Sequence, residues 1–363
     1  MATEPTQPTQ PASQPPSSTV PQIVIQQGNG FFGRLFVWIG WTGFALCATL
    51  VMSQYLILSD YFDTSGGIYE SFHSGAEFAR DKVAIISLTG VIIEGDGFVK
   101  RQIDRVRNDE NVKAIVLRIN SPGGTVTGSD YIYHHLSRLR KERNLPMVVS
   151  MGSMAASGGY YAAMAVADQP KSIYAEPTTT TGSIGVIIPH YDISGLMSRF
   201  DVKDDSISSH PRKQMLSMTR PIPDEHRIIL QRYVDESFDR FKEIVKSGRP
   251  IFVENPDLLD ELATGEIFSA TQAKKHGLVD EIGFIEDAID RALEICGLEK
   301  ETTRVVRYQK QAGLFGLPAI TMSANQQSSD LNTLLELSAP RAYYLVTSLP
   351  PFIASYARLL NSN

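Results

Sequence analysis

A serine in a glycine-rich turn is the side chain of this sequence best placed for nucleophilic chemistry. Ser157 lies in the segment Met154–Tyr160 (MAASGGY), between a short apolar run and a stretch of small residues expected to be helical. A serine at such a strand-to-helix turn is accessible, and the helix N-terminus with nearby backbone N–H groups can stabilise an oxyanion. The alternative is a serine that only caps the helix. Two glycines directly after a cap are poor helix formers, so close approach of a substrate explains them better.

A second glycine-rich turn, Asn120–Gly124 (NSPGG), directly follows the apolar run Ala114–Ile119 (AIVLRI). Glycines there can take positive φ and let a backbone N–H approach a ligand closely. A tight turn with no ligand explains the same residues. The segment is therefore a candidate oxyanion donor whose role the residues alone leave open.

The elements around these turns indicate an α/β fold. Short β-rich runs at Val83–Leu88, Ala114–Ile119 and Met147–Ser150 alternate with helical patterns. The helical patterns cover 127–143 and an apolar stripe of 3.6-residue period from Leu230 to Val245. Such alternation favours parallel strands joined by right-handed crossovers. In folds of this kind ligands collect at the carboxyl ends of the strands, where both glycine-rich turns lie.

The N-terminal part of the sequence predicts a disordered tail and a membrane anchor. Residues 1–30 are rich in Pro, Gln, Thr and Ser, a composition that cannot bury enough apolar surface to fold. Leu35–Leu58 carries no formal charge and would form about 36 Å of helix, against a hydrocarbon core of about 30 Å. The anchor, set at 31–59, begins too far from the N-terminus for a cleaved signal peptide. Arg34 precedes the span and acidic residues follow it, so the positive-inside rule places the tail in the cytoplasm.

Composition argues against several classes of partner. A net charge of −6 at pH 7 without a concentrated basic face argues against nucleic-acid binding. The two cysteines, Cys47 in the apolar span and Cys296 far downstream, are not placed for a disulfide. The seven histidines have no close ligand spacing, so we predict no metal and no other cofactor.

Four motifs occur in a characteristic order. They are INSPGG at 119–124, SMGSMAASGGYY at 150–161, TGSIGV at 181–186 and AKKHGLVDEIG at 273–283. With this set the sequence resembles the signal peptide peptidase A family, also called protease IV. The resemblance runs from about Lys82 to about Gly297, with a weaker match at 339–341. It implies an α/β fold related to Clp protease and crotonase, in which turns of a ββα spiral stack, and it implies Ser-Lys chemistry.

The resemblance assigns roles to four residues of this sequence. Ser157 matches the nucleophile, and Lys213 matches the general base. Gly124 matches an oxyanion-hole backbone donor, and Ser183 matches a serine that hydrogen-bonds the lysine. The second oxyanion donor would be the backbone N–H of Ser157 or Gly158. Without the resemblance, Lys213 would be interpreted as a solvated surface lysine, whereas Ser157 has a local rationale of its own.

The resemblance also implies how the protein is organised. Residues 81–298 would form a serine peptidase domain outside the cytoplasm, joined by a linker at 60–80 to a single-pass transmembrane helix in the cell membrane. Its substrates would be signal-peptide remnants and other hydrophobic peptides. A ring-shaped homo-oligomer is implied, in which the catalytic lysine can come from a neighbouring subunit. Residues 299–363 are interpreted as a partly ordered C-terminal extension.

Three other interpretations are compatible with parts of the sequence. A Ser-His-Asp peptidase like Clp would use His190 as the base in place of Lys213. A crotonase-like acyl-CoA enzyme would use related oxyanion glycines without a nucleophilic serine, which leaves Ser157 unexplained. A catalytically silent membrane scaffold would recruit partners through its Pro-rich tail.

Overall fold

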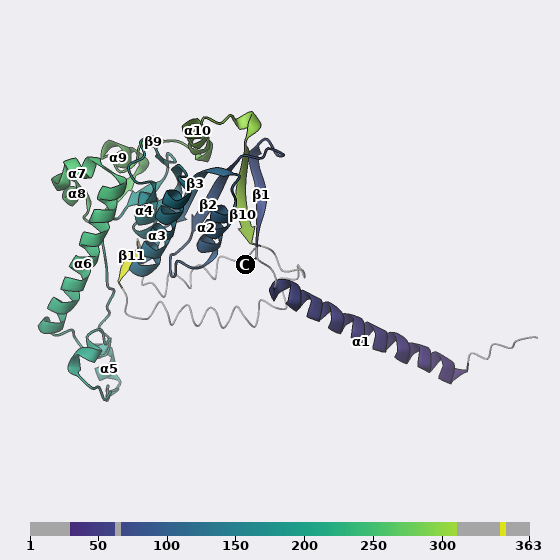
Figure 1. Ribbon diagram of the computed structural model, residues 1–363. Coiled ribbons are helices and arrows are strands. Elements are labelled where there is room, and N and C mark those ends of the chain that lie inside the picture. Colours follow the sequence, from purple (N-terminus) through teal and green to yellow (C-terminus); the bar gives the residue numbers. More distant parts are fainter. Residues whose placement is uncertain (1–29, 62–66, 311–341, 346–363) are drawn as a thin grey trace, which may run out of the picture. The chain divides into compact units, whose positions relative to one another are not determined.

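The computed structural model describes residues 30–61, 67–310 and 342–345 (Figure 1). The chain divides into two compact units, residues 1–63 and 64–363. The predicted disordered tail lies outside the described residues except for its last position.

Helix α1 (Phe31–Tyr61) is the described element of the first unit. Within it, Arg34–Tyr55 is a 22-residue span of hydropathy 1.9, and its most apolar window is not buried against protein. By length and composition this helix can cross a bilayer, and it coincides with the span predicted from the sequence.

The second unit is built on a nine-stranded sheet. The main path is β1-β10-β2-β3-β5-β6-β9; β1 and β10 are antiparallel, and every later pair on the path is parallel. Strand β7 pairs with β5, β8 pairs with β7, and β4 and β11 form a separate ladder. The strands are β1 (Ile68–Gly75), β2 (Lys82–Thr89), β3 (Val112–Ser121), β4 (Gly123–Thr125), β5 (Met147–Ala156), β6 (Ile173–Ala175), β7 (Thr180–Gly182), β8 (Ile267–Ser269), β9 (Glu281–Ile282), β10 (Arg304–Lys310) and β11 (Tyr343–Leu345).

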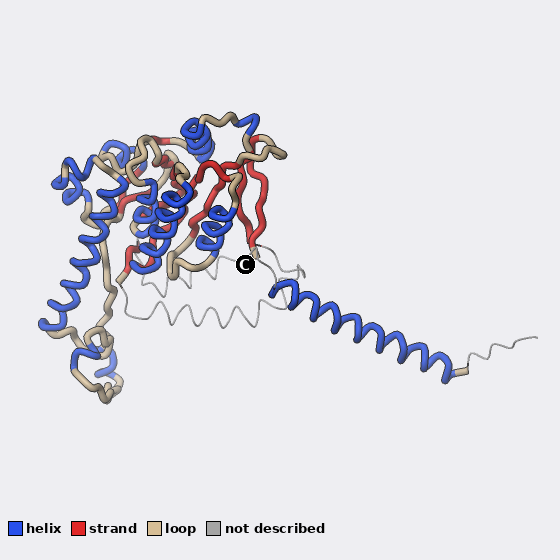
Figure 2. Tube along the Cα trace, in the orientation of Figure 1, coloured by secondary structure: helices blue, strands red, loops and turns tan. Residues whose placement is uncertain are grey.

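Helices cover both faces of the central strands, which is why β2 and β3 are apolar on both faces. Helices α2 (Phe98–Asn108) and α3 (Val126–Arg143) pack on one face, in front of the strands in Figure 2. Helix α10 (Ile285–Cys296) packs on the other face. The remaining helices are α4 (Gly158–Ala163), η1 (Met164–Val166), α5 (Ser194–Arg199), η2 (Pro211–Gln214), α6 (Asp224–Gly248), α7 (Ile251–Glu254), α8 (Pro256–Leu262), α9 (Ala270–Lys275) and η3 (Lys300–Thr302).

The segment between the sheet and α6, residues 187–223, forms an arm that includes α5 and η2. In Figure 1, α5 lies beyond the N-terminal end of α6, whereas the C-terminal part of that helix packs on the domain. None of the residues 187–223 is buried. The arm therefore stands out from the core of this unit.

The strands and helices predicted from the sequence are confirmed at β2, β3, β5, α3 and α6. Two segments differ from expectation. Strand β1 lies in the stretch expected to be the linker at 60–80, and β10 lies in the stretch expected to be the extension at 299–363. Strand β10 joins the sheet by pairing with β2, and β1 joins it by pairing with β10 across some 240 positions, a long-range pairing that no local pattern predicts.

Candidate active site

Ser157 stands between the end of β5 and the start of α4, in a backbone conformation that is unusual for a non-glycine residue. Its φ is 54° and its ψ is −116°. Its N–H donates to the Gly182 carbonyl at 2.8 Å, and its own carbonyl accepts from Tyr161 N at 2.8 Å. These bonds hold the strained turn, which costs about 1–3 kcal/mol in comparable cases.

The Ser157 hydroxyl is not used to cap α4, and it has no hydrogen-bond partner among the described residues. The residue is only 1% exposed, which differs from the accessible serine expected from the sequence. The capping interpretation therefore does not account for this serine. A hydroxyl held in a strained turn without a structural bond is the arrangement expected of a nucleophile.

The two glycine-rich turns pack directly against each other. A Cβ built on Gly158 would lie 2.3 Å from the Ser129 hydroxyl oxygen and 3.2 Å from Gly124 N. A Cβ built on Gly123, whose φ is 96°, would lie 2.6 Å from Gly158 N. Only glycines allow this approach, and it brings the backbone nitrogens of Gly124 and Gly158 to the same place beside Ser157.

Ser183 directly follows strand β7, at the same level of the sheet as Ser157. Ala156 of β5 and Gly182 of β7 are paired Cα partners in a parallel ladder, so Ser157 and Ser183 each come one residue after the pair. Ser183 has a φ of 51° and is 8% exposed, and its N–H donates to Glu266 O at 2.6 Å. Its hydroxyl also has no hydrogen-bond partner among the described residues.

Lys213 makes no contact with Ser157 among those that the structure describes. It lies in η2 on the arm and is exposed, and its N–H donates to the His210 carbonyl at 2.9 Å. Among the described residues its amino group has no partner. Ser157, Ser183 and the two glycines thus come together, and Lys213 has no described contact with them.

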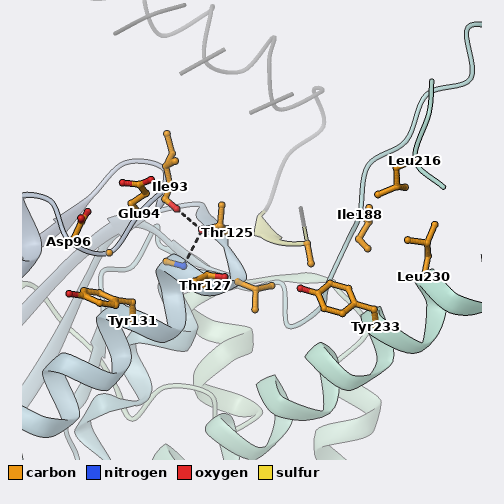
Figure 3. Close-up of a pocket in the computed structure, with 14 residues that line it drawn as sticks. Ile93, Glu94, Asp96, Thr125, Thr127, Tyr131, Ile188, Leu216, Leu230 and Tyr233 are labelled. Carbon is orange, nitrogen blue, oxygen red and sulfur yellow. Dashed lines mark hydrogen bonds between the residues drawn. The ribbon is translucent and has the colours of Figure 1, made fainter. Parts of the chain in front are cut away.

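A cavity of about 670 Å³ lies between the start of α3 and the arm (Figure 3). Thr125 is near its floor, where its hydroxyl donates to Ile93 O at 2.6 Å and accepts from Gly128 N at 3.1 Å. One wall carries the carboxylates of Glu94 and Asp96, and the opposite wall is apolar. The apolar wall consists of Ile188, Leu216, Leu230 and Tyr233.

Strand β11 occupies the edge of β4 next to Ser157. The two strands are antiparallel, with Tyr344 opposite Gly124. A Cβ built on Gly123 would lie 2.1 Å from the Tyr344 carbonyl oxygen, so this carbonyl sits against the glycine-rich turn. The only sequence signal for this contact is the short apolar run at 342–346.

The Tyr344 side chain is fully buried in an aromatic pocket. Its ring centroid lies 5.2 Å from that of Tyr161 and 4.5 Å from that of Phe241, and its hydroxyl donates to Ser237 O at 2.8 Å. Burial, followed by a hydrogen bond to Asp130 at 2.5 Å, raises the pKa of Tyr161. The Tyr344 ring therefore packs among aromatic rings beside the β4 edge.

Comparison with known proteins gives matches to two family models. Residues 139–299 match peptidase family S49, and residues 84–182 match Clp protease. The chain is 36% identical over 222 residues to "Putative protease slr0021" of Synechocystis sp., which covers 61% of this chain and 77% of that protein. The chain belongs to peptidase family S49.

Two further relatives of this S49 chain carry more specific names. "Putative signal peptide peptidase SppA" of Enterococcus faecium is 34% identical over 61% of this chain, and "Protease 4" of Salmonella typhi is 34% identical over 60%. The chain spans 65% and 35% of their respective lengths. The family resemblance drawn from the four motifs and the α/β fold with a Clp-like domain are both confirmed.

His190, considered as an alternative base, has a different described contact in this S49 chain. Its Nε2 donates to Ser217 O at 3.0 Å, which connects two parts of the arm.

Within the described residues, no three His, Cys, Asp or Glu side chains are grouped in a way that could hold a metal ion.

Proposed function

We propose that this chain is a membrane-anchored serine endopeptidase in which Ser157 is the nucleophile and Lys213 of a neighbouring copy is the general base. The observation that carries the proposal is Ser157 itself, a strained serine whose free hydroxyl lies beside the converging nitrogens of Gly124 and Gly158. Membership of family S49 and the names of the relatives support it.

In the proposed reaction, neutral Lys213 takes the proton from Ser157 Oγ as the oxygen attacks the scissile carbonyl carbon. The N–H groups of Gly124 and Gly158 stabilise the tetrahedral oxyanion, a contribution of about 3–4 kcal/mol per donor in comparable sites. The protonated lysine then gives its proton to the leaving amine, and an acyl-enzyme remains. Water, deprotonated by the same lysine, attacks the acyl carbon; the bond to Ser157 Oγ breaks, Oγ takes the proton back from the lysine, and the carboxylate product leaves. Ser183, next to Ser157, hydrogen-bonds the lysine and orients its amino group toward Ser157 Oγ.

The edge of β4 is where a substrate would add as an extended strand, because β-strand addition satisfies backbone groups and brings the scissile carbonyl to the oxyanion donors. Strand β11 uses this edge in the structure, with the Tyr344 carbonyl against the turn. A substrate strand therefore has to replace β11. The apolar pocket that holds Tyr344 suits hydrophobic peptides, including signal-peptide remnants, as substrates.

A neighbouring copy is proposed as the source of the lysine for two reasons. Lys213 is exposed in its own chain, whereas a lysine acts as a base only where desolvation favours its neutral form. The arm that carries it also exposes large apolar side chains, among them Phe200 at 73% and Ile207 at 102%. Apolar side chains gathered on one projecting segment are typical of a contact surface, and a ring-shaped homo-oligomer would cover them.

Helix α1 is proposed to span the cell membrane once, with the N-terminus in the cytoplasm and the peptidase domain outside it. Its apolar span and the single Arg34 before it support this orientation. The first strand of the domain, β1, begins seven positions after the end of α1.

Subunit mixing tests the proposal. Ser157→Ala and Lys213→Ala chains are each expected to be inactive, while oligomers that contain both regain part of the peptidase activity. Lys203→Ala, at another exposed lysine of the arm, is the matched control and should stay active. A fluorophosphonate should label Ser157 in the unmodified protein. Labelling at another serine, or full activity of Lys213→Ala, would contradict the assignment.

A further inference from the structure

The arm that carries Lys213 has no hydrophobic core of its own. None of its residues from 187 to 223 is buried, and its regular elements are only the six-residue α5 and the four-residue η2. Backbone freedom costs about 1–2 kcal/mol per residue to remove, so a segment of this kind needs polar contacts to hold one conformation.

Asp204 accepts four hydrogen bonds within the arm. One carboxylate oxygen accepts from Ser206 N at 3.0 Å and from the Ser206 hydroxyl. The other accepts from the Thr219 hydroxyl and from the Arg220 guanidinium at 2.8 Å. The carboxylate thus joins 204–206 to 219–220, and Lys213 lies in the loop that it closes.

The environment of Asp204 is unusual for the arm. Its side chain is only 14% exposed, while most of the neighbouring residues are exposed. The hydroxyls of Ser206 and Thr219, followed by the Arg220 guanidinium, hold the pKa of this carboxyl well below its usual range. Asp204 is therefore an ionised acceptor at neutral pH.

A second contact holds the same end of the loop. His190 Nε2 donates to Ser217 O at 3.0 Å, and the Ser217 hydroxyl lies 2.6 Å from the Thr219 hydroxyl. His190 comes from the beginning of the arm, so 217–220 is fixed from two directions. Three segments of the arm thereby converge on the stretch that follows Lys213.

We propose that Asp204 is a positioning residue for Lys213, which it holds in place for the active site by closing the loop that carries the lysine, with His190 as a second contact. This inference rests on the proposed function, in which Lys213 is the base. A base works only when it is held within hydrogen-bond reach of the proton it takes, and a misplacement of 1 Å can cost 100-fold in rate. Loss of the carboxylate lets the loop take other conformations without touching substrate.

Asp204→Asn is the first test, with Asp205→Asn as the matched control, because Asp205 is exposed and has no partner among the described residues. We expect Asp204→Asn to lower kcat at least tenfold with little change in KM, and to slow fluorophosphonate labelling of Ser157 in parallel. Thr219→Val, which removes one donor to the same carboxylate, should lower kcat several-fold. Asp205→Asn should change neither quantity. An unchanged kcat in Asp204→Asn would overturn the proposal.

Subunit mixing separates positioning of the lysine from a general effect on folding. Asp204→Asn chains mixed with Ser157→Ala chains should regain activity, because the Ser157→Ala chain contributes an intact arm. Asp204→Asn mixed with Lys213→Ala should not regain it. Equal recovery in both mixtures, or loss of the assembled oligomer in both Asp204→Asn and Thr219→Val, would show that Asp204 does not act through Lys213.

The mixture of Ser157→Ala with Lys213→Ala shows independently whether the dyad is shared between subunits. If that mixture stays inactive, the intersubunit dyad fails. The role of Asp204 is then tested by comparing kcat and the labelling rate of Asp204→Asn with those of Asp205→Asn. Lower values in Asp204→Asn alone would support positioning of a base in the same chain. Unchanged values would refute the positioning role.

Discussion

Ser157 and Ser183 occupy matching positions at the ends of two hydrogen-bonded parallel strands, each with a positive φ, of 54° and 51°. The backbone N–H of Ser157 donates to the carbonyl of Gly182, the residue before Ser183. The two hydroxyl-bearing residues are thus fixed to each other through the main chain. Neither hydroxyl takes part in this link, and this makes single substitutions at either position informative.

Replacing Ser183 by alanine should impair catalysis without unfolding the protein. Its backbone contacts remain, and only a hydroxyl without a described partner is lost. If that hydroxyl orients the lysine, kcat should fall about tenfold or more, with KM nearly unchanged. Steady-state peptide hydrolysis measures both. Ser71→Ala on β1, at the opposite edge of the sheet, is the control; equal activities of the two variants would argue against a role for Ser183.

Replacing Ser157 by glycine or alanine should separate strain from chemistry. Both variants lack the nucleophile and should be inactive, but only glycine takes a φ of 54° and a ψ of −116° readily. We expect Ser157→Gly to be more stable than Ser157→Ala by about 1 kcal/mol, measured by denaturant unfolding in detergent. Ala162→Gly, in the ordinary helical backbone of α4, should instead destabilise by about 1 kcal/mol. A less stable Ser157→Gly would mean that the turn stores no strain.

The contact between the two glycine-rich turns gives a double-mutant test. A Cβ at Gly158 would lie 2.3 Å from the Ser129 hydroxyl oxygen, so Gly158→Ala should destabilise by about 1–3 kcal/mol and abolish activity. Ser129→Ala removes that oxygen and loses its hydrogen bond to Thr125 O at 2.8 Å. The double variant should be more stable than the sum of the two single effects predicts, by 0.5 kcal/mol or more. Strict additivity would contradict the contact.

The parts of this protein that local sequence patterns encode could be predicted. Apolar runs such as Val83–Leu88 predict strands, the stripe from Leu230 to Val245 predicts α6, and the glycines around Ser157 predict the turn. Each of these depends on neighbours within one turn or strand. For this reason the central strands and the nucleophile turn could be placed without any knowledge of the rest of the chain.

What could not be predicted depends on partners that are distant in the sequence or lie in another chain. Strand β1 reaches the sheet through β10, and the three-residue β11 reaches β4 across more than 200 positions, so neither has a strong pattern of its own. The position of Lys213 could not be predicted from local sequence either. Its role came only from the family resemblance, and one chain by itself leaves it exposed.

The pairing of β11 with β4 predicts competition between the chain's own strand and a substrate. Tyr344→Ala removes a buried ring and its hydrogen bond to Ser237 O, which should release β11 from the edge of β4. We expect KM for a hydrophobic peptide to fall several-fold with kcat maintained, because the substrate no longer displaces a bound strand. Tyr344→Phe keeps the ring contacts with Tyr161 and Phe241 and should behave nearly as the unmodified protein. Thermal unfolding establishes that both variants are folded. If KM rises in Tyr344→Ala while Ser157 is still labelled by a fluorophosphonate, β11 is instead a wall of the substrate groove, and a substrate must bind beside it.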